Sequence, residues 1–399
     1  MSEADAGGAP ALMRATFARL DTRRLPTPCY VVDEVLLERN LRLLRRVKEA
    51  SGAKVLLALK GFAMWHYGPL IGRYLDGVCA SGLHEAKLGR ERFAGEVHCF
   101  AAAYPPADMA EVLALSDHVI FNSFHQWQRF QPEIRAAKAR RPGLHFGLRL
   151  NPEQPEGDYP LYDPSVAGSR LGIVRSEFRP ELLDGIDGLH FHNLCEQNIE
   201  PLQRTVAAIE ERFGEFIPRM RWINFGGGHH ITRPDYQVEA LIDLIRRFRD
   251  KWGVDVIIEP GEAVALGTGV YVSEVLDVSR NGLDLLIIDG SCSAHLPDVL
   301  EMPYRPELLG AGQPGELGHD YRIGGLTCLA GDVIGDYSFP APVQVGQRLV
   351  FLDMAHYTMV KTNTFNGVKL PAIVAWNSAS DALTVVHEYG YDDFQQRLS

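Results

Sequence analysis

Short apolar runs alternate along the chain with longer segments in which apolar residues recur at helical spacing. The short runs predict parallel strands and the longer segments predict helices between most of them. One such helix is expected between Asp33, which can cap it, and Gly52, which can end it. The expected strands lie at 54–60, 77–80, 97–101, 118–122, 145–150, 188–192, 222–225 and 254–259. Eight such units over about two hundred residues match the size of a (β/α)₈ barrel.

Beyond Pro260 the pattern changes, because strand-like runs follow one another with little helix between them. These runs are GVYVSEVLDVSR, LDLLIIDGS, QRLVFLDMAHYT, AIVAWNS and ALTVVHEYG. The fold class is therefore expected to be α/β, a TIM-type barrel followed by a C-terminal β domain. We expect the barrel over residues 29–264 and the β domain over 265–399, with residues 1–28 joined to the β domain.

Composition and charge narrow the function classes. Of 399 residues, 46% are hydrophobic and 23% charged, as in folded proteins, and 40 basic against 51 acidic residues give a net charge of −11. With no dense Lys/Arg run, we expect no nucleic-acid partner and no membrane surface. No apolar stretch approaches the roughly 18 residues of a membrane span, and the start MSEADAGGAP does not resemble a signal peptide, so a cytoplasmic location is expected.

The six cysteines are scattered without a CxxC pair, which argues against a zinc ribbon and against a disulfide framework. Candidate chemistry is expected instead at the C-terminal ends of the barrel strands. Lys60 ends the apolar run VLLAL, where partial loss of water would lower its pKa and make it an amine nucleophile. The alternative is a solvated strand-end lysine, since lysines often lie at such positions.

Two histidines and three glycines also lie at predicted strand ends. His190 and His192 are two apart and therefore face one side of a strand. They could bind a metal, His192 could lie against an aromatic cofactor ring, or both could be hydrogen-bonded interior residues. Gly226, Gly227 and Gly228 follow WINF and could bring bare backbone N–H groups against a phosphate, or form only a flexible turn.

Glu259 ends the apolar run DVII, and a carboxylate buried there needs a protonated or cationic partner. The pyridinium nitrogen of pyridoxal 5′-phosphate would satisfy it. This cofactor would unite the candidates, with Lys60 as the amine that bonds to it, His192 against its ring, and the glycines at its phosphate. We therefore expect this cofactor, and no metal at the site.

At these residues the chain resembles the alanine-racemase-fold, pyridoxal-phosphate-dependent decarboxylases, which include ornithine, arginine and diaminopimelate decarboxylases. It is most similar to the branch that acts on carboxynorspermidine or carboxyspermidine. The resemblance covers nearly the whole chain, in the order TPCYVVD, LALKGF, RLNPE, SRLGI, LHFHNLCEQN, NFGGGHH, IEPGEA, AHLPDVLEMPYRP, GLTCLAGDVIG and AHYTMVKTNTFNG.

The resemblance implies roles for these residues and for others. Lys60 would hold the cofactor, Glu259 would keep its ring nitrogen protonated, and Cys328 would lie near the reacting carbon and return a proton to it. Cys328 and Tyr357 would reach the site from the partner subunit, so a homodimer is implied, with Tyr357 near the phosphate. The residues expected to bind substrate are Glu262, Asp298, Arg170 and Asp332.

Departures from the diaminopimelate decarboxylase pattern carry the substrate argument. That enzyme has EPGR, an arginine after HLI, and CESGD, whereas this chain has Glu262, Asp298 and Leu329 at the corresponding places. Two basic residues have become acidic, which repels a distal substrate carboxylate and attracts amines. The predicted reaction is therefore decarboxylation of a carboxylated polyamine to norspermidine or spermidine. For both acids the alternative is a solvated loop charge.

Three alternative functions remain at this point. Diaminopimelate decarboxylase is the nearest in chemistry. A metal-dependent barrel hydrolase would use His190, His192 and His229. A non-catalytic pyridoxal-phosphate carrier would share the barrel but would normally lack the second domain.

Overall fold

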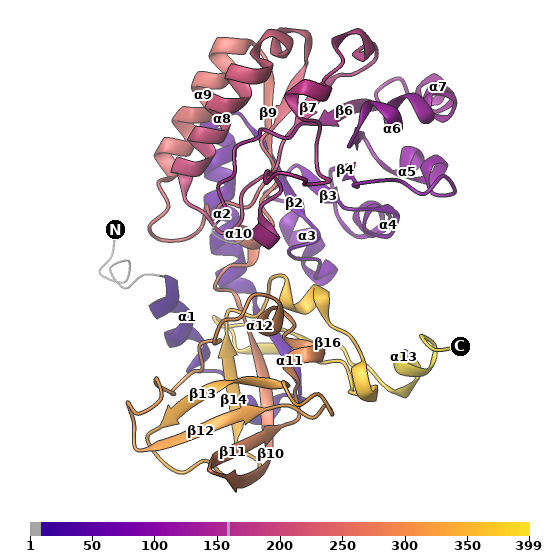
Figure 1. The fold of residues 1–399 in the computed structure, drawn as a ribbon. Coiled ribbons are helices and arrows are strands. Elements are labelled where there is room, and N and C mark those ends of the chain that lie inside the picture. The colour runs from indigo at the N-terminus through magenta and orange to yellow at the C-terminus, as the bar shows by residue number, and fades with distance from the viewer. Residues whose placement is uncertain (1–8, 158–159) are drawn as a thin grey trace. The chain divides into compact units, whose positions relative to one another are not determined.

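The computed structural model describes residues 9–157 and 160–399, so the polar lead over residues 1–8 lies outside the described residues. The chain forms two compact units, residues 40–264 and residues 265–399 with the N-terminal segment up to Arg39. Figure 1 labels most of the strands and helices of both. Among the described residues, none of the helices combines the length and the apolar character that a bilayer crossing requires.

The first unit is a closed barrel of eight parallel strands. Each of the eight predicted strands is confirmed to within a few residues. The strands are β2 (Lys54–Ala58), β3 (Gly77–Ala80), β4 (Glu96–Phe100), β5 (His118–Phe121), β6 (His145–Arg149), β7 (Gly188–His190), β8 (Trp222–Asn224) and β9 (Asp255–Ile258).

One helix precedes β2, and helices follow most of these strands. They are α2 (Glu34–Ser51), α3 (Gly68–Ile71), α4 (Leu83–Arg92), α5 (Met109–Leu115), α6 (Phe124–Arg129), α7 (Gln131–Arg140), α8 (Ile199–Phe213), α9 (Val238–Trp252) and α10 (Glu262–Ala265). Short 3₁₀ turns lie at 65–67, 160–162, 175–177, 180–182 and 214–219. The predicted boundaries of α2 are confirmed. Asp33 accepts the Leu36 N–H at 3.1 Å at the start of the helix, and Gly52 has φ of 72° just after its end.

The barrel interior is filled by side chains. Leu56, Ile120, Trp222 and Ile257 form a buried cluster there. The Trp222 ring occupies the space beside the two strands that precede β8, because a Cβ at Gly147 or Gly188 would lie within 2.4 Å of it. The barrel is thus a packed core with its chemistry at the strand ends.

The second unit is a mixed sheet with the order β13-β12-β11-β10-β1-β15-β16, in which β14 also pairs with β10. Its strands are β1 (Cys29–Asp33), β10 (Gly269–Asn281), β11 (Leu283–Ile288), β12 (His319–Gly324), β13 (Val333–Phe339), β14 (Arg348–Leu352), β15 (Ala372–Asn377) and β16 (Ala382–His387). Its helices are α1 (Ala9–Phe17), α11 (Cys292–His295), α12 (Asp298–Glu301) and α13 (Tyr391–Gln395), with 3₁₀ turns at 22–24, 358–361 and 365–367.

One domain boundary differs from the expectation. The strand over 29–33 was expected to begin the barrel domain, but β1 pairs antiparallel with β10 and parallel with β15. Residues 29–39 therefore belong to the sheet unit, and the barrel unit begins at residue 40. A strand followed by an amphipathic helix looks like a βα unit in sequence, and only the pairing partners distinguish the two cases.

Candidate active site

Lys60 lies two residues beyond the buried strand β2, at the C-terminal end of the barrel. Its Nζ is 3.3 Å from Nε2 of His192, which follows β7. Lys60 keeps access to solvent at the barrel mouth, yet protein atoms crowd around it. This loss of water, together with the nearby charge of Arg149, lowers the pKa of Lys60. A lysine with a lowered pKa is a better amine nucleophile at neutral pH.

The hydrogen bonds of His192 define which of its ring nitrogens carries the proton. Burial, and then the charge of Lys60, hold the pKa of His192 well below its usual value, so the ring is neutral. Its Nδ1 accepts a hydrogen bond from the Gly227 N–H at 2.8 Å. We therefore assign the proton to Nε2, where it points at Lys60 and can be donated to the neutral amine.

The three glycines after β8 are required by their surroundings. Gly226 and Gly228 have φ of 69° and 84°, and a Cβ at Gly228 would lie 1.9 Å from the Leu194 carbonyl oxygen. The prediction that all three offer N–H groups to a phosphate needs correction, however. The Gly226 N–H donates to Asn224 Oδ1 at 2.8 Å, and the Gly227 N–H is used by His192.

Two amide groups of the same loop remain for an anion. Within residues 9–157 and 160–399, the N–H groups of Gly228 and His229 have no hydrogen-bond acceptor. Successive N–H groups in a glycine-rich turn are suited to an oxyanion. We therefore expect the phosphate to contact the N–H groups of Gly228 and His229 rather than those of all three glycines.

Glu259 is buried just beyond β9 and is held as a carboxylate. Burial alone would raise its pKa, but His190 and Asn224 outweigh that effect and lower the pKa to about 2. Asn224 Nδ2 donates to Oε1 at 2.7 Å, and His190 Nε2 lies 3.4 Å from Oε2. The barrel thus places a fixed negative charge beneath its mouth, as a pyridinium nitrogen requires.

Asn224 connects the two parts of the site, since it binds Glu259 through its amide nitrogen and the glycine loop through its oxygen. Asn224 was not predicted from the sequence. The available signal was a polar side chain at the last position of a buried strand, next to the glycines.

Arg149 ends β6 inside the barrel and contributes the second charge near Lys60. Its Nη2 donates to the His192 carbonyl at 2.6 Å, and its guanidinium lies 4.6 Å from the centre of the Phe100 ring. Burial lowers the pKa of Arg149 to about 10, which leaves it charged. Arg170, expected to bind substrate, is exposed, and its charge acts on Arg149.

Glu262, at the start of α10, is buried and its Oε2 lies 3.0 Å from Nε2 of His230. The turn after Lys60 packs close by, because a Cβ at Gly61 would lie 3.1 Å from the Glu262 nitrogen. The Glu262 backbone therefore packs against the turn that follows Lys60, and one of its carboxylate oxygens is close to an imidazole.

The sheet unit carries the remaining predicted residues, which we describe by themselves. Cys328 is exposed, and its N–H donates to Asn366 Oδ1 at 2.9 Å. Tyr357 has an unusual φ of 45°. Asp298 on α12 binds Lys361, with 2.5 Å between its Oδ1 and the lysine Nζ, and Glu301 lies equally close to that nitrogen.

Asp332 is placed differently from the expectation that it binds substrate. The residue is 4% exposed, and its carboxylate accepts hydrogen bonds from Ser291 Oγ, the Cys292 N–H and Thr327 Oγ1, at 2.9, 2.7 and 2.6 Å. These donors occupy both oxygens. Asp332 therefore anchors the loop that carries Cys328, and its geometry does not fit a direct contact with substrate.

The residues at the barrel mouth fit a pyridoxal cofactor. They supply a lysine of lowered pKa, a neutral imidazole beside it, two amide donors for a phosphate and an ionised carboxylate. His190 Nδ1 is also buried there without a hydrogen-bond partner among the described residues.

The metal-dependent hydrolase does not fit. His229 Nδ1 lies 2.7 Å from the Tyr236 hydroxyl, and the one group of converging metal-ligand atoms found in the described part of the chain is Glu96, His98 and His118.

Known proteins resemble this chain over nearly its full length. A decarboxylase from Campylobacter jejuni named for carboxynorspermidine and carboxyspermidine is 42% identical and covers 94% of this chain and 99% of its own length. A carboxyaminopropylagmatine decarboxylase from Synechocystis is 42% identical and covers 94% of this chain and 96% of its own.

Solved structures agree with this comparison. The Campylobacter jejuni carboxynorspermidine decarboxylase, crystallised with norspermidine, has a TM-score of 0.86 at 41% identity, covering 94% of this chain and all of that one. A Helicobacter pylori diaminopimelate decarboxylase shares the fold, with a TM-score of 0.78 at 15% identity, covering 94% of this chain and 97% of its own.

The family model described as pyridoxal-dependent decarboxylase, C-terminal sheet domain, matches residues 29–355. It thus spans the barrel with its lysine, imidazole and carboxylate and much of the sheet that follows. By sequence, by fold and by the groups gathered at its barrel mouth, the chain belongs to the pyridoxal-dependent decarboxylase family.

Proposed function

We propose that this protein releases carbon dioxide from a carboxylated polyamine, carboxynorspermidine or carboxyspermidine, with pyridoxal 5′-phosphate bound at the barrel mouth. For the substrate class, the observation that carries the proposal is the full-length similarity to relatives named for carboxylated polyamines. The diaminopimelate decarboxylases are more distant, at 25% identity or less. The acidic residues at positions 262 and 298 support the same choice.

The chain's own residues divide the chemistry between them. When bound, the cofactor takes up the electron pair that carbon dioxide leaves behind. Lys60 is the amine that holds the cofactor and is exchanged for the substrate amine. Glu259 stays ionised and stabilises positive charge at the ring nitrogen, while the Gly228 and His229 amides hold the phosphate. Cys328 is the proposed proton donor to the reacting carbon.

The proposal is tested by carbon dioxide release from a panel of substrates. We expect kcat/KM for carboxynorspermidine and carboxyspermidine to exceed that for diaminopimelate by at least about 100-fold, because a distal carboxylate meets acidic residues. The two polyamines differ by one methylene and should stay within roughly 200-fold of each other. Ornithine and carboxyaminopropylagmatine complete the panel. Preferential turnover of diaminopimelate would overturn the proposed substrate class.

Asp298 is the acid proposed to attract a substrate amine, and it is occupied by the Lys361 ammonium. A substrate ammonium has the same charge and could replace it. We expect Asp298→Asn to raise KM for carboxynorspermidine about tenfold with a smaller change in kcat, as for loss of one partly screened ion pair. Steady-state kinetics on the purified holoenzyme measure both constants.

Glu301→Gln is the matched control, because Glu301 binds the same lysine but is more exposed, at 50% against 17% for Asp298. It should leave KM within about twofold of the parent. Equal effects of the two substitutions would argue against a specific role for Asp298. Glu262 stays the second candidate for attracting a substrate amine. Its carboxylate lies beside His230 and is not the solvated loop charge that was the alternative.

We also infer a homodimer in which Cys328 and Tyr357 complete the site of the partner subunit. The loop around Cys328 supports this, because it exposes Leu326 and Leu329, which are 46% and 44% accessible. Exposed apolar residues of this kind favour an interface. Asp332 is then a positioning residue for that loop. A cytoplasmic location stays a prediction, and the six free cysteines are consistent with it.

A further inference from the structure

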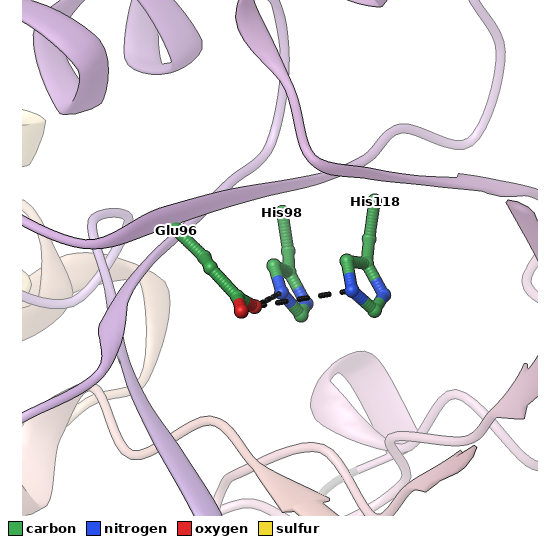
Figure 2. A group of neighbouring side chains, drawn as sticks. All are labelled: Glu96, His98 and His118. Carbon is green, nitrogen blue, oxygen red and sulfur yellow. Dashed lines mark hydrogen bonds and ion pairs between the residues drawn. The ribbon is translucent and has the colours of Figure 1, made fainter. Parts of the chain in front are cut away.

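A second polar cluster lies at the N-terminal ends of the barrel strands, the end opposite to Lys60. Glu96 begins β4, His98 follows two residues later on the same strand, and His118 begins β5 in register with His98. Figure 2 shows the three side chains together, with the Glu96 carboxylate and the two imidazoles side by side. Both imidazoles are buried, with side chains that are 1% and 7% exposed.

The atoms of this cluster are spaced like metal ligands. Glu96 Oε2 lies 2.8 Å from His98 Nε2 and 3.8 Å from His118 Nε2, and one ligand atom from each residue lies within 4.8 Å of the others. In a tetrahedral site with metal–ligand distances of about 2.0–2.1 Å, ligand atoms lie roughly 3.3 Å apart. The two distances to Glu96 fall on either side of that value.

The cluster has a route to solvent. Nδ1 of His98 and Nδ1 of His118 are buried without a hydrogen-bond partner among the residues that the structure describes, but they lie on the far side of each ring from Nε2 and are not ligand atoms of this site. The Glu96 side chain is 36% exposed, so an ion can enter past it and keep a water molecule as its fourth ligand.

We propose that Glu96, His98 and His118 form a binding site for a divalent transition metal of the zinc class. Imidazole nitrogens with one carboxylate are a ligand set that suits such ions. The site is separate from the proposed catalytic chemistry and does not depend on it. At the N-terminal face of a barrel, we assign it a stabilising role that joins β4 to β5.

Binding has two structural requirements. Lys54 Nζ lies 2.6 Å from both oxygens of Glu96, so its ammonium competes with the metal and must move away. Lys54 is 32% exposed and can turn into solvent. The imidazoles are stacked 3.8 Å apart at 11°, so one ring must rotate for both lone pairs to converge. His145, the next ring on β6, faces Asp187 at 3.4 Å and is outside the group.

Zinc binding is tested with two variants that should have opposite effects, loss of a ligand in one and loss of the competing Lys54 charge in the other. Purified holoenzyme is incubated with zinc, dialysed against buffered free zinc and analysed for metal by mass spectrometry. We expect about one zinc ion per chain in excess over His118→Phe, which keeps the stacked ring but lacks the ligand. Lys54→Met should bind the same ion roughly tenfold more tightly, because it removes the competing charge.

Two controls keep the test independent of folding and of the catalytic site. His125→Phe removes an exposed histidine on α6 and should leave zinc uptake unchanged. The visible absorption of the bound cofactor reports that each variant is folded. The proposal is overturned if His118→Phe retains as much zinc as the parent, or if Lys54→Met binds zinc no more tightly.

Discussion

Replacing Lys60 with alanine is expected to abolish decarboxylation and to remove the visible absorption of the bound cofactor. Lys60 is the amine whose pKa is lowered beside the neutral ring of His192, 3.3 Å away. Alanine leaves no nucleophile to join the cofactor or to be exchanged for the substrate amine. We expect kcat to fall by roughly 10³-fold or more, as for loss of a covalent catalyst. Single-turnover carbon dioxide release and the absorption spectrum measure the two effects.

Two control variants are Lys60→Arg and Lys87→Ala. The first tests whether the positive charge of Lys60 is sufficient without its nucleophilic amine, and the second tests whether loss of any lysine lowers activity. Arginine keeps a positive charge but is not a nucleophile at neutral pH, so it should fail as alanine does. Lys87, paired with Glu111 on the barrel surface, should be replaceable without effect. A Lys60→Ala enzyme that keeps its visible band would show that another lysine holds the cofactor.

Glu259→Gln is expected to have the second largest effect, a fall in kcat of about 10²–10³-fold in a folded protein. The Glu259 side chain is 10% exposed, and His190 and Asn224 hold its carboxylate ionised, with its pKa at about 2. Glutamine can still accept the Asn224 hydrogen bond, but it removes the negative charge that stabilises a protonated ring nitrogen. Steady-state kinetics and the pH dependence of the cofactor spectrum should both change.

The control for this substitution is Glu85→Gln. Glu85 lies on α4 and accepts the Ser81 N–H at 2.6 Å, close to the end of a neighbouring barrel strand. We expect it to leave kcat and the spectrum within about twofold of the parent. An unaltered kcat in Glu259→Gln would contradict the assignment of this carboxylate to the ring nitrogen.

The barrel could be predicted because each buried parallel strand is a short apolar run of its own. Two strands of the sheet, β12 and β13, were not predicted, because neither is a continuous apolar run. In β12 the two buried apolar residues, Tyr321 and Ile323, alternate with charged ones, and Arg322 pairs with Asp336 across to β13. The placement of β1 could not be predicted either, since it depends on hydrogen bonding to strands about 240 and 340 residues later.

The site could be predicted as far as strand ends define it. Lys60, His192, the glycines and Glu259 follow separate strands, and the barrel brings those ends together. Their roles stay predictions. The sequence could not show which polar atoms of the site already have hydrogen-bond or ion-pair partners within the chain. The amides of Gly226 and Gly227, and the carboxylates of Asp298 and Asp332, have partners that only the folded chain reveals.

Peptide mapping of the holoenzyme after borohydride treatment tests the central claim most directly, because the hydride fixes a carbonyl cofactor to the lysine that carries it. We predict that mass spectrometry finds the added cofactor mass on the peptide that contains LALKGF, at Lys60. Finding that mass on a different lysine, or on none, would contradict the account.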